Sequence, residues 1–226
     1  MSAPLAASAD AEGNVSKSNQ SQDKKIQILK AATALLNEQG LQALSFENLA
    51  HASGLSRQLI RYYFSSLDTL VSELCDYLGN TYREILVAGV LQVGQVERLR
   101  FFTDFLFDLT DEHRMPDNLE AYDALVAYAV GSIGVRERLC EKYKTLGQVI
   151  AHELAIAHPE LDGPACEELS FLFVSMMHAH WSFVASLGFS RQHSLVIRNA
   201  IDRLIASYVN EQTPSERIKG MWAQKK

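Results

Sequence analysis

Four side chains near residue 60 have hydrogen-bonding or aromatic groups at regular spacing. Arg57 and Arg61 are four residues apart. Gln58 and Tyr62 have the same separation, so on an α-helix all four lie in one arc of the surface. Arginine can form two hydrogen bonds with guanine and glutamine two with adenine, and Leu59 can contact a thymine methyl group. This arc carries the chemistry needed to read base edges in the major groove of DNA.

The segments around this arc predict how it is positioned. Two helical patterns, 45–52 and 56–64, are separated by Ser53-Gly54-Leu55, which is the spacing of a helix-turn-helix. Gly54 can adopt the left-handed backbone of the turn, and the Ser56 hydroxyl can cap the second helix. The alternative is that 56–64 is an ordinary solvated helix, because arginine and glutamine are common surface residues and helix-turn-helix patterns often occur by chance.

A third helical pattern precedes these two and favours the helix-turn-helix. Its apolar residues recur at i, i+3, i+4, i+7 and i+8, and the pattern ends at Gly40. They are Ile28, Ala31, Ala32, Leu35 and Leu36. About fifty residues therefore predict a capped three-helix unit.

This unit resembles the N-terminal domain of the TetR family of one-component bacterial regulators. The matching motifs are Ile28-Leu29-Lys30-Ala31-Ala32, Gly40, Ser45 with Leu49-Ala50, Ala52-Ser53-Gly54-Leu55-Ser56, and Tyr62-Tyr63-Phe64. They span about 45 residues, a fifth of the chain. The predicted DNA-binding residues are Lys25, Ser45, Ser56, Arg57, Gln58, Leu59, Arg61, Tyr62 and Tyr63.

Two positions depart from the family pattern. Arg61 stands where the family usually has a tyrosine, and Leu67 stands where it usually has a lysine. Both family residues usually contact phosphates, so the resemblance implies that one positioning contact is lost at Leu67, and that Arg61 can replace the other.

Composition bounds the class of protein. The chain has 226 residues, 47% hydrophobic and 21% charged, enough for one large or two small domains with a packed core. It has no run long enough to span a membrane and no pattern of a signal peptide. Three widely spaced cysteines, Cys75, Cys140 and Cys166, are typical of reduced buried thiols. The expected location is the cytoplasm.

Charge is distributed unevenly along the chain. The net charge is −6, which by itself argues against binding to a polyanion. Residues 24–72, however, carry a balance of +2, so the remainder carries −8. The positive charge is concentrated where the DNA-reading arc lies, and we expect salt-sensitive binding that depends on dimerisation.

The rest of the chain has helical patterns and no alternating strand pattern. Helices are predicted over 65–90, 96–113, 117–130, 134–158, 166–188 and 191–212. We expect an all-α protein of about nine helices, in which a long helix joins an N-terminal helix-turn-helix head to a C-terminal helical ligand-binding and dimerisation bundle. The predicted parts are a disordered tail over 1–23, a DNA-binding domain over 24–72, a ligand-binding and dimerisation domain over 73–211, and a C-terminal tail over 212–226.

The last two helical segments predict a homodimer. Segment 166–188 is apolar nearly all round, so one side can face its own core and the other a second subunit. The alternative is a central buried helix in a monomer. A dimer also suits the reading of a palindromic double-stranded operator with half-sites ~34 Å apart. The predicted interface residues are Phe173, Met176, His180, Val184, Leu195, Ile201 and Ile205.

The middle helices supply candidates for a small-molecule site. Aromatic and apolar side chains with a few polar tips are typical of ligand pockets, although most such side chains are ordinary core. The predicted ligand-binding residues are Phe102, Phe105, Tyr122, Tyr128, Met177, His178 and Trp181. No spacing indicates a metal site, a cofactor or catalysis, because His178 and His180 lie on nearly opposite helix faces and no HExxH, CxxC or GxSxG occurs.

These expectations combine into a transcriptional regulator that is not an enzyme. The resemblance implies a dimeric repressor that a small, largely apolar or aromatic effector releases from its operator. One alternative keeps the DNA-binding head and replaces the ligand with a protein partner. The other is an all-α enzyme or carrier whose helix-turn-helix pattern is accidental.

Overall fold

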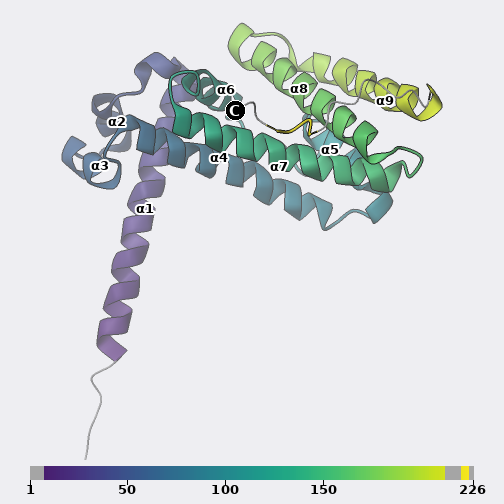
Figure 1. Ribbon diagram of the computed structural model, residues 1–226. Helices are drawn as coiled ribbons and strands as arrows, with labels where there is room; N and C mark the ends of the chain where they lie inside the picture. The colour runs from purple at the N-terminus through teal and green to yellow at the C-terminus, as the bar shows by residue number, and fades with distance from the viewer. Residues whose placement is uncertain (1–7, 212–219, 224–226) are drawn as a thin grey trace, which may run out of the picture. The chain divides into compact units, whose positions relative to one another are not determined.

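The chain folds into helices only, as far as the structure describes it. The computed structural model describes residues 8–211 and 220–223, and these contain nine α-helices, three short 3-10 turns and no strand (Figure 1). The predicted all-α fold class is confirmed. The chain divides into two compact units, Met1–Leu74 and Cys75–Lys226, and the division falls inside one long helix, α4 (Leu67–Val90).

The first unit is built on three helices and the start of α4. They are α1 (Ser8–Gln39), a 3-10 turn η1 (Leu41–Ala43), α2 (Phe46–Ser53) and α3 (Arg57–Tyr63). Its core contains the predicted α1 stripe together with side chains of the next three helices. The fully buried members are Ile28, Ala32, Leu36, Leu49, Ile60, Phe64, Leu70, Val71 and Leu74.

Helix α1 begins at Ser8, within the segment predicted to be disordered. The prediction of disorder rested on composition, because this segment has few apolar side chains that could be buried in a core. Helical hydrogen bonds are local to the backbone, so residues 8–23 can extend the helix that the packed stripe after Lys24 already establishes. Residues 1–7 lie outside the described part.

The turn between α2 and α3 depends on Gly54. Its φ of 67° lies in the left-handed region, and a methyl group added there would meet no other atom within 4 Å. A substitution at Gly54 therefore tests backbone conformation without a steric clash.

We expect Gly54→Ala to lower the free energy of unfolding by about 1–2 kcal/mol, because alanine is disfavoured at positive φ. Gly134→Ala is the matched control, since Gly134 is helical and its added methyl group also meets nothing within 4 Å. This control should be neutral or more stable by up to ~1 kcal/mol. Urea unfolding followed by circular dichroism measures both, and equal stabilities for the two variants would contradict the assignment.

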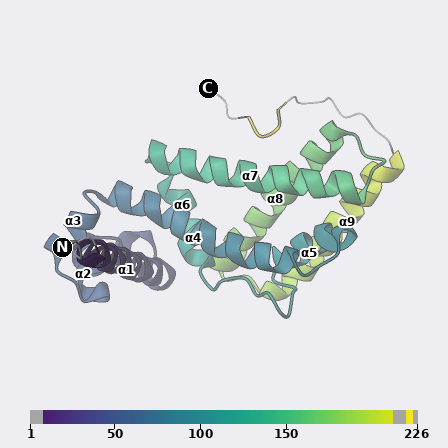
Figure 2. The ribbon, with the colours of Figure 1, turned by 90° about the horizontal axis from the view of Figure 1, so that it is seen from below.

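The second unit contains the remainder of α4 and five further helices. They are α5 (Arg98–Phe105), α6 (Leu119–Tyr128), α7 (Ile133–Ala157), α8 (Gly163–Leu187) and α9 (Ser194–Glu211), with 3-10 turns η2 (Gln95–Glu97) and η3 (Arg191–His193). Helix α8 packs against α6, α7 and α9 (Figures 1 and 2). Its inner face, which includes Leu169, Phe173 and Met177, contributes to the hydrophobic core of this unit.

Helix α5 is shorter than the pattern over 96–113 predicted. It ends at Phe105, and Asp108 takes a φ of 55°, which turns the chain into a loop that continues to Asn118. Phe107 is fully buried and packs edge-on against Phe173 at a ring distance of 5.8 Å. The apolar residues after Phe105 thus belong to the core, but they reach it from a loop.

Among the described residues after α9, Trp222 packs against α7 and α8. Trp222 donates a hydrogen bond from Nε1 to the Ser170 hydroxyl (3.0 Å) and contacts the Phe171 ring edge-on. A methyl group at Gly147 would lie 2.0 Å from the Trp222 ring. Gly147 therefore provides the space that this tryptophan occupies.

The three cysteines are free thiols, and burial raises the pKa of Cys75 to about 11. None of the helices in the described residues is both long and apolar enough to cross a membrane. No three His, Cys, Asp or Glu side chains in that part of the chain are grouped so that they could hold a metal ion.

Candidate nucleic-acid interface and effector cavity

Side-chain caps fix both helices of the helix-turn-helix. The Ser45 hydroxyl accepts a hydrogen bond from the backbone N–H of Asn48 (3.1 Å) at the start of α2. The Ser56 hydroxyl accepts one from Leu59 N–H (3.2 Å) at the start of α3. Each cap satisfies a backbone donor that the helix itself leaves without a partner. Ser45 and Ser56 therefore have a structural role, whether or not they also contact DNA.

The two faces of α3 differ in burial. Ile60 and the following Phe64 are fully buried, and they anchor the helix in the core of the first unit. On the opposite face Arg57, Gln58 and Arg61 are exposed. Tyr62 is 78% exposed, an unusual placement for a tyrosine that has no binding role. The structure thus brings the four predicted base-reading side chains together on one solvent-facing surface, with Leu59 and Tyr63 half-buried beside them.

Two aromatic contacts restrict the side chains of this surface. The Arg61 guanidinium lies 4.6 Å from the centre of the Phe46 ring. The Tyr62 and Tyr63 rings meet edge-to-face at 5.2 Å. Such contacts limit rotamer freedom, which lowers the entropy lost when the side chains bind.

Lys25 has a partner within the first unit. Its Nζ forms an ion pair with Glu73 at 3.1 Å and lies 5.6 Å from the centre of the Phe64 ring. This arrangement attaches α1 to the start of α4. That Lys25 contacts DNA stays a prediction, and such a contact would require the lysine to leave Glu73 and Phe64.

A cavity of about 570 Å³ lies within the second unit, lined by residues of α4, α5, α6, α7 and α8 and of the loop between α5 and α6. Six of the seven predicted ligand-binding residues line it. They are Phe102, Phe105, Tyr122, Met177, His178 and Trp181. The prediction is wrong for Tyr128, which is absent from the wall. It is six residues from Tyr122 on α6, so the two side chains point in different directions.

Two tyrosines of the wall were not found from the sequence. Tyr82 meets Tyr122 edge-to-face at 5.9 Å, and Tyr122 meets Tyr143 in the same way at 6.2 Å. The Tyr143 hydroxyl lies 3.0 Å from Nδ1 of His178, at hydrogen-bond distance. Tyr143 lies in the charged stretch Glu141-Lys142-Tyr143-Lys144, which resembles a solvated surface, so no local signal identified it.

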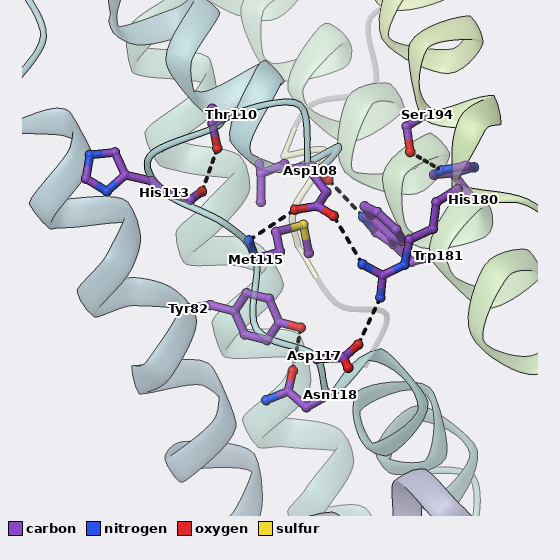
Figure 3. Close-up of polar contacts among 12 residues, drawn as sticks. Tyr82, Asp108, Thr110, His113, Met115, Asp117, Asn118, His180, Trp181 and Ser194 are labelled. Carbon is purple, nitrogen blue, oxygen red and sulfur yellow. Dashed lines mark hydrogen bonds and ion pairs between the residues drawn. The ribbon is translucent and has the colours of Figure 1, made fainter.

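Three side chains, through four hydrogen bonds, hold the loop between α5 and α6 against the cavity (Figure 3). Trp181 donates from Nε1 to the Leu106 carbonyl (2.8 Å), and Tyr82 donates to the Asn118 side-chain oxygen (2.6 Å). The guanidinium of Arg191 donates to Asp108 and to Asp117, each at 3.1 Å. Leu106 and Met115 of this loop line the cavity, so these contacts fix part of its wall.

The predicted dimer-interface residues fall into two groups. Phe173, His180, Ile201 and Ile205 are buried in the chain's own core, and His180 lies at hydrogen-bond distance from Ser194 (3.0 Å). These four side chains therefore contribute to the chain's own core and have little surface left for a second subunit. Met176 and Val184 are half-buried, and Leu195 is 54% exposed, so these three remain available.

Comparison with known proteins matches both units of the fold. Residues 28–74 match the family model of bacterial regulatory proteins, tetR family. No curated protein has a sequence that matches this chain.

Solved structures of regulators share the fold over most of the chain. A TetR transcription regulator from Haloarcula marismortui has a TM-score of 0.71 at 17% identity, and the match covers 82% of this chain and 98% of that one. A transcriptional regulator from Saccharomonospora viridis in complex with choline has a TM-score of 0.68 at 17% identity, covering 82% and 96%. A TetR-family regulator from Rhodococcus sp. has a TM-score of 0.63 at 21% identity, covering 81% and 99%.

The family match includes the capped turn and the exposed face of α3, and the shared fold extends through the helices that surround the cavity. Residues 28–74 are therefore similar to the tetR family of bacterial regulatory proteins, and over four fifths of its length the chain has the fold of solved structures of such regulators.

Proposed function

We propose that this protein is a dimeric repressor that binds a palindromic DNA operator and leaves it when a small, largely apolar or aromatic effector occupies the cavity. The observation that carries the proposal is the outer face of α3. It presents two arginines, a glutamine and a tyrosine to solvent, while the opposite face is fully buried. A helix held in this way can enter the major groove without unfolding.

The cavity supports control by a small molecule. Its volume of about 570 Å³ lies within the range of ligand sites, and its wall is mainly apolar and aromatic. This favours a small-molecule effector over control by a protein partner, which needs an exposed surface and no internal space. The proposal gives the cavity a binding role and no catalytic one.

Helix α4 supports a route from effector to DNA. Leu70 and Leu74 of α4 are fully buried in the core of the first unit, while Tyr82, Leu86 and Val90 of the same helix line the cavity. An effector that displaces these cavity residues moves a helix on which the DNA-binding unit is packed. The effector then shifts the population towards the form that does not fit the operator.

An exposed apolar face supports the dimer. Phe183 is 54% exposed and Leu187 63% on α8, and Val196 is 60% exposed on α9. One short α3 helix contacts few bases, whereas a two-fold pair reads two half-sites. A second copy of this chain both covers the apolar face and supplies the second α3 helix. A protein of this function acts in the cytoplasm, where the DNA is.

An electrophoretic mobility shift with genomic fragments, including the one upstream of the protein's own gene, tests the proposal. We expect one fragment or a few to shift at nanomolar protein in the presence of excess unrelated DNA. An extract of small molecules from the same cells should reverse the shift. Equal retardation of all fragments, or none, would contradict sequence-specific regulation.

A further inference from the structure

Four polar or aromatic side chains of the cavity wall form a connected row. Tyr82, Tyr122, Tyr143 and His178 come from α4, α6, α7 and α8, and each ring meets the next edge-to-face. At one end of the row, Tyr82 donates its hydrogen bond to Asn118. At the other end, Nδ1 of His178 pairs with Tyr143. Four helices therefore hold one hydrogen-bonding group, the His178 ring, at the cavity wall.

The remaining nitrogen of His178 is available to a ligand. His178 is half-buried and lines the cavity, and its Nε2 has no hydrogen-bond partner among the described residues. The indole N–H of Trp181, three residues further along α8, is already bonded to Leu106. Trp181 therefore offers a ligand its ring, while His178 offers a hydrogen bond.

The charged groups of the wall are exposed or have partners. Arg83 and Glu141 are exposed to solvent, and Lys142 is paired with Asp76 at 3.0 Å. Asp123 accepts a hydrogen bond from Ser186. Burial raises the pKa of Tyr122 and of Tyr143, so both phenols are uncharged at neutral pH. The tyrosine rings of the row are thus neutral.

We propose that the effector is an uncharged aromatic molecule with a hydroxyl group, and that this hydroxyl hydrogen-bonds to Nε2 of His178 while the ring packs against Trp181, Phe102 and Phe105. The inference rests on the proposed function and specifies the ligand of the same cavity.

A hydroxyl group suits this position because it can both donate and accept. When the Tyr143 hydroxyl donates to Nδ1, Nε2 carries the proton and donates to the ligand. When Nδ1–H donates to Tyr143 instead, Nε2 accepts from the ligand. A hydroxyl satisfies either arrangement, whereas a hydrocarbon satisfies neither.

Isothermal titration with three probes at pH 7 tests the ligand class. The probes are 2-naphthol, naphthalene, which has the same rings without the hydroxyl, and choline, whose quaternary ammonium group also suits aromatic walls. We expect 2-naphthol to bind about fivefold to tenfold more tightly than naphthalene, the effect of one hydrogen bond. Choline should bind more weakly than both.

Variants locate the hydrogen bond. His178→Phe should remove the preference for 2-naphthol over naphthalene while naphthalene still binds. Tyr143→Phe deletes the hydroxyl that pairs with Nδ1 of His178 and keeps the ring, so it should reduce the preference for 2-naphthol over naphthalene. This variant tests the same hydrogen bond if His178→Phe does not fold. His152→Phe is the matched control, since His152 is exposed on α7 and does not line the cavity. It should keep the full preference.

The outcomes separate this inference from the proposed function. Equal binding of the two naphthalene probes, an unchanged preference in His178→Phe and Tyr143→Phe, or tighter binding of choline overturns the hydroxyl-aromatic class, while the cavity remains a ligand site. Failure of all three probes to bind overturns the class and also removes the support for control by a small molecule. Operator binding measured in the same samples reports on α3 independently.

Discussion

Replacing Arg57 and Arg61 together by alanine is expected to weaken sequence-specific DNA binding at least about a hundredfold. Each bidentate contact with a base contributes about 1–3 kcal/mol of discrimination, and each subunit of a dimer loses two such side chains. Both arginines are exposed on α3, so their removal leaves the buried face unchanged. Fluorescence anisotropy with the shifted fragment measures the affinity.

Two further variants make this prediction specific. Arg203→Ala removes one positive charge from an exposed position on α9 and should leave the affinity within about twofold. Gln58→Ala changes no charge and should cost about tenfold by loss of one base contact. It also avoids disturbing the packing of Arg61 on Phe46. Unchanged binding in both α3 variants would show that another surface reads the DNA.

Phe183→Glu combined with Leu187→Glu is expected to convert the proposed dimer into monomers of 25.2 kDa. The two side chains are 54% and 63% exposed on α8, and burying two carboxylates between subunits without partners is strongly unfavourable. Operator affinity should fall more than about a hundredfold, because each monomer contacts only one half-site. Analytical ultracentrifugation and anisotropy measure the two effects.

The control places one glutamate on a different apolar side chain. Val130 is 79% exposed just after α6 and belongs to neither α8 nor α9. Val130→Glu should therefore leave both the dimer and the operator affinity unchanged. A wild-type protein that is already monomeric, or a double variant that stays dimeric, would exclude this face of α8 as the interface.

The helix-turn-helix could be predicted from the sequence because its determinants are local. Ser45, Gly54 and Ser56 act on backbone groups within a few residues, through two caps and one positive φ. The spacing of Ile60 and Phe64 then sets which side of α3 is buried. Arg57, Gln58, Arg61 and Tyr62 take the opposite side as a consequence.

The cavity was predicted by composition more than by geometry. Aromatic side chains identified the right helices, but helix orientation decided that Tyr122 lines the wall and Tyr128 does not. The loop contacts of Arg191 with Asp108 and Asp117 join residues 83 and 74 positions apart, which no local pattern reports.

Phe173 and His180 were predicted at an interface and lie in the chain's own core, because α8 is apolar on both sides. Its sequence shows that two surfaces need covering, but not which surface faces the chain's own core. Phe173 and His180 are seven residues apart and share the inner face, where both are buried. Phe183 and Leu187 share another face and are exposed.

The central claim is that two outward-facing α3 helices of one dimer read two half-sites. Hydroxyl-radical footprinting of a DNA fragment with the protein bound tests this claim most directly. The account predicts two related protected segments on one face of the duplex, with centres ~34 Å apart and a two-fold symmetric sequence, and both should disappear together in the Arg57→Ala, Arg61→Ala variant. A single protected segment, or protection without sequence preference, would contradict it.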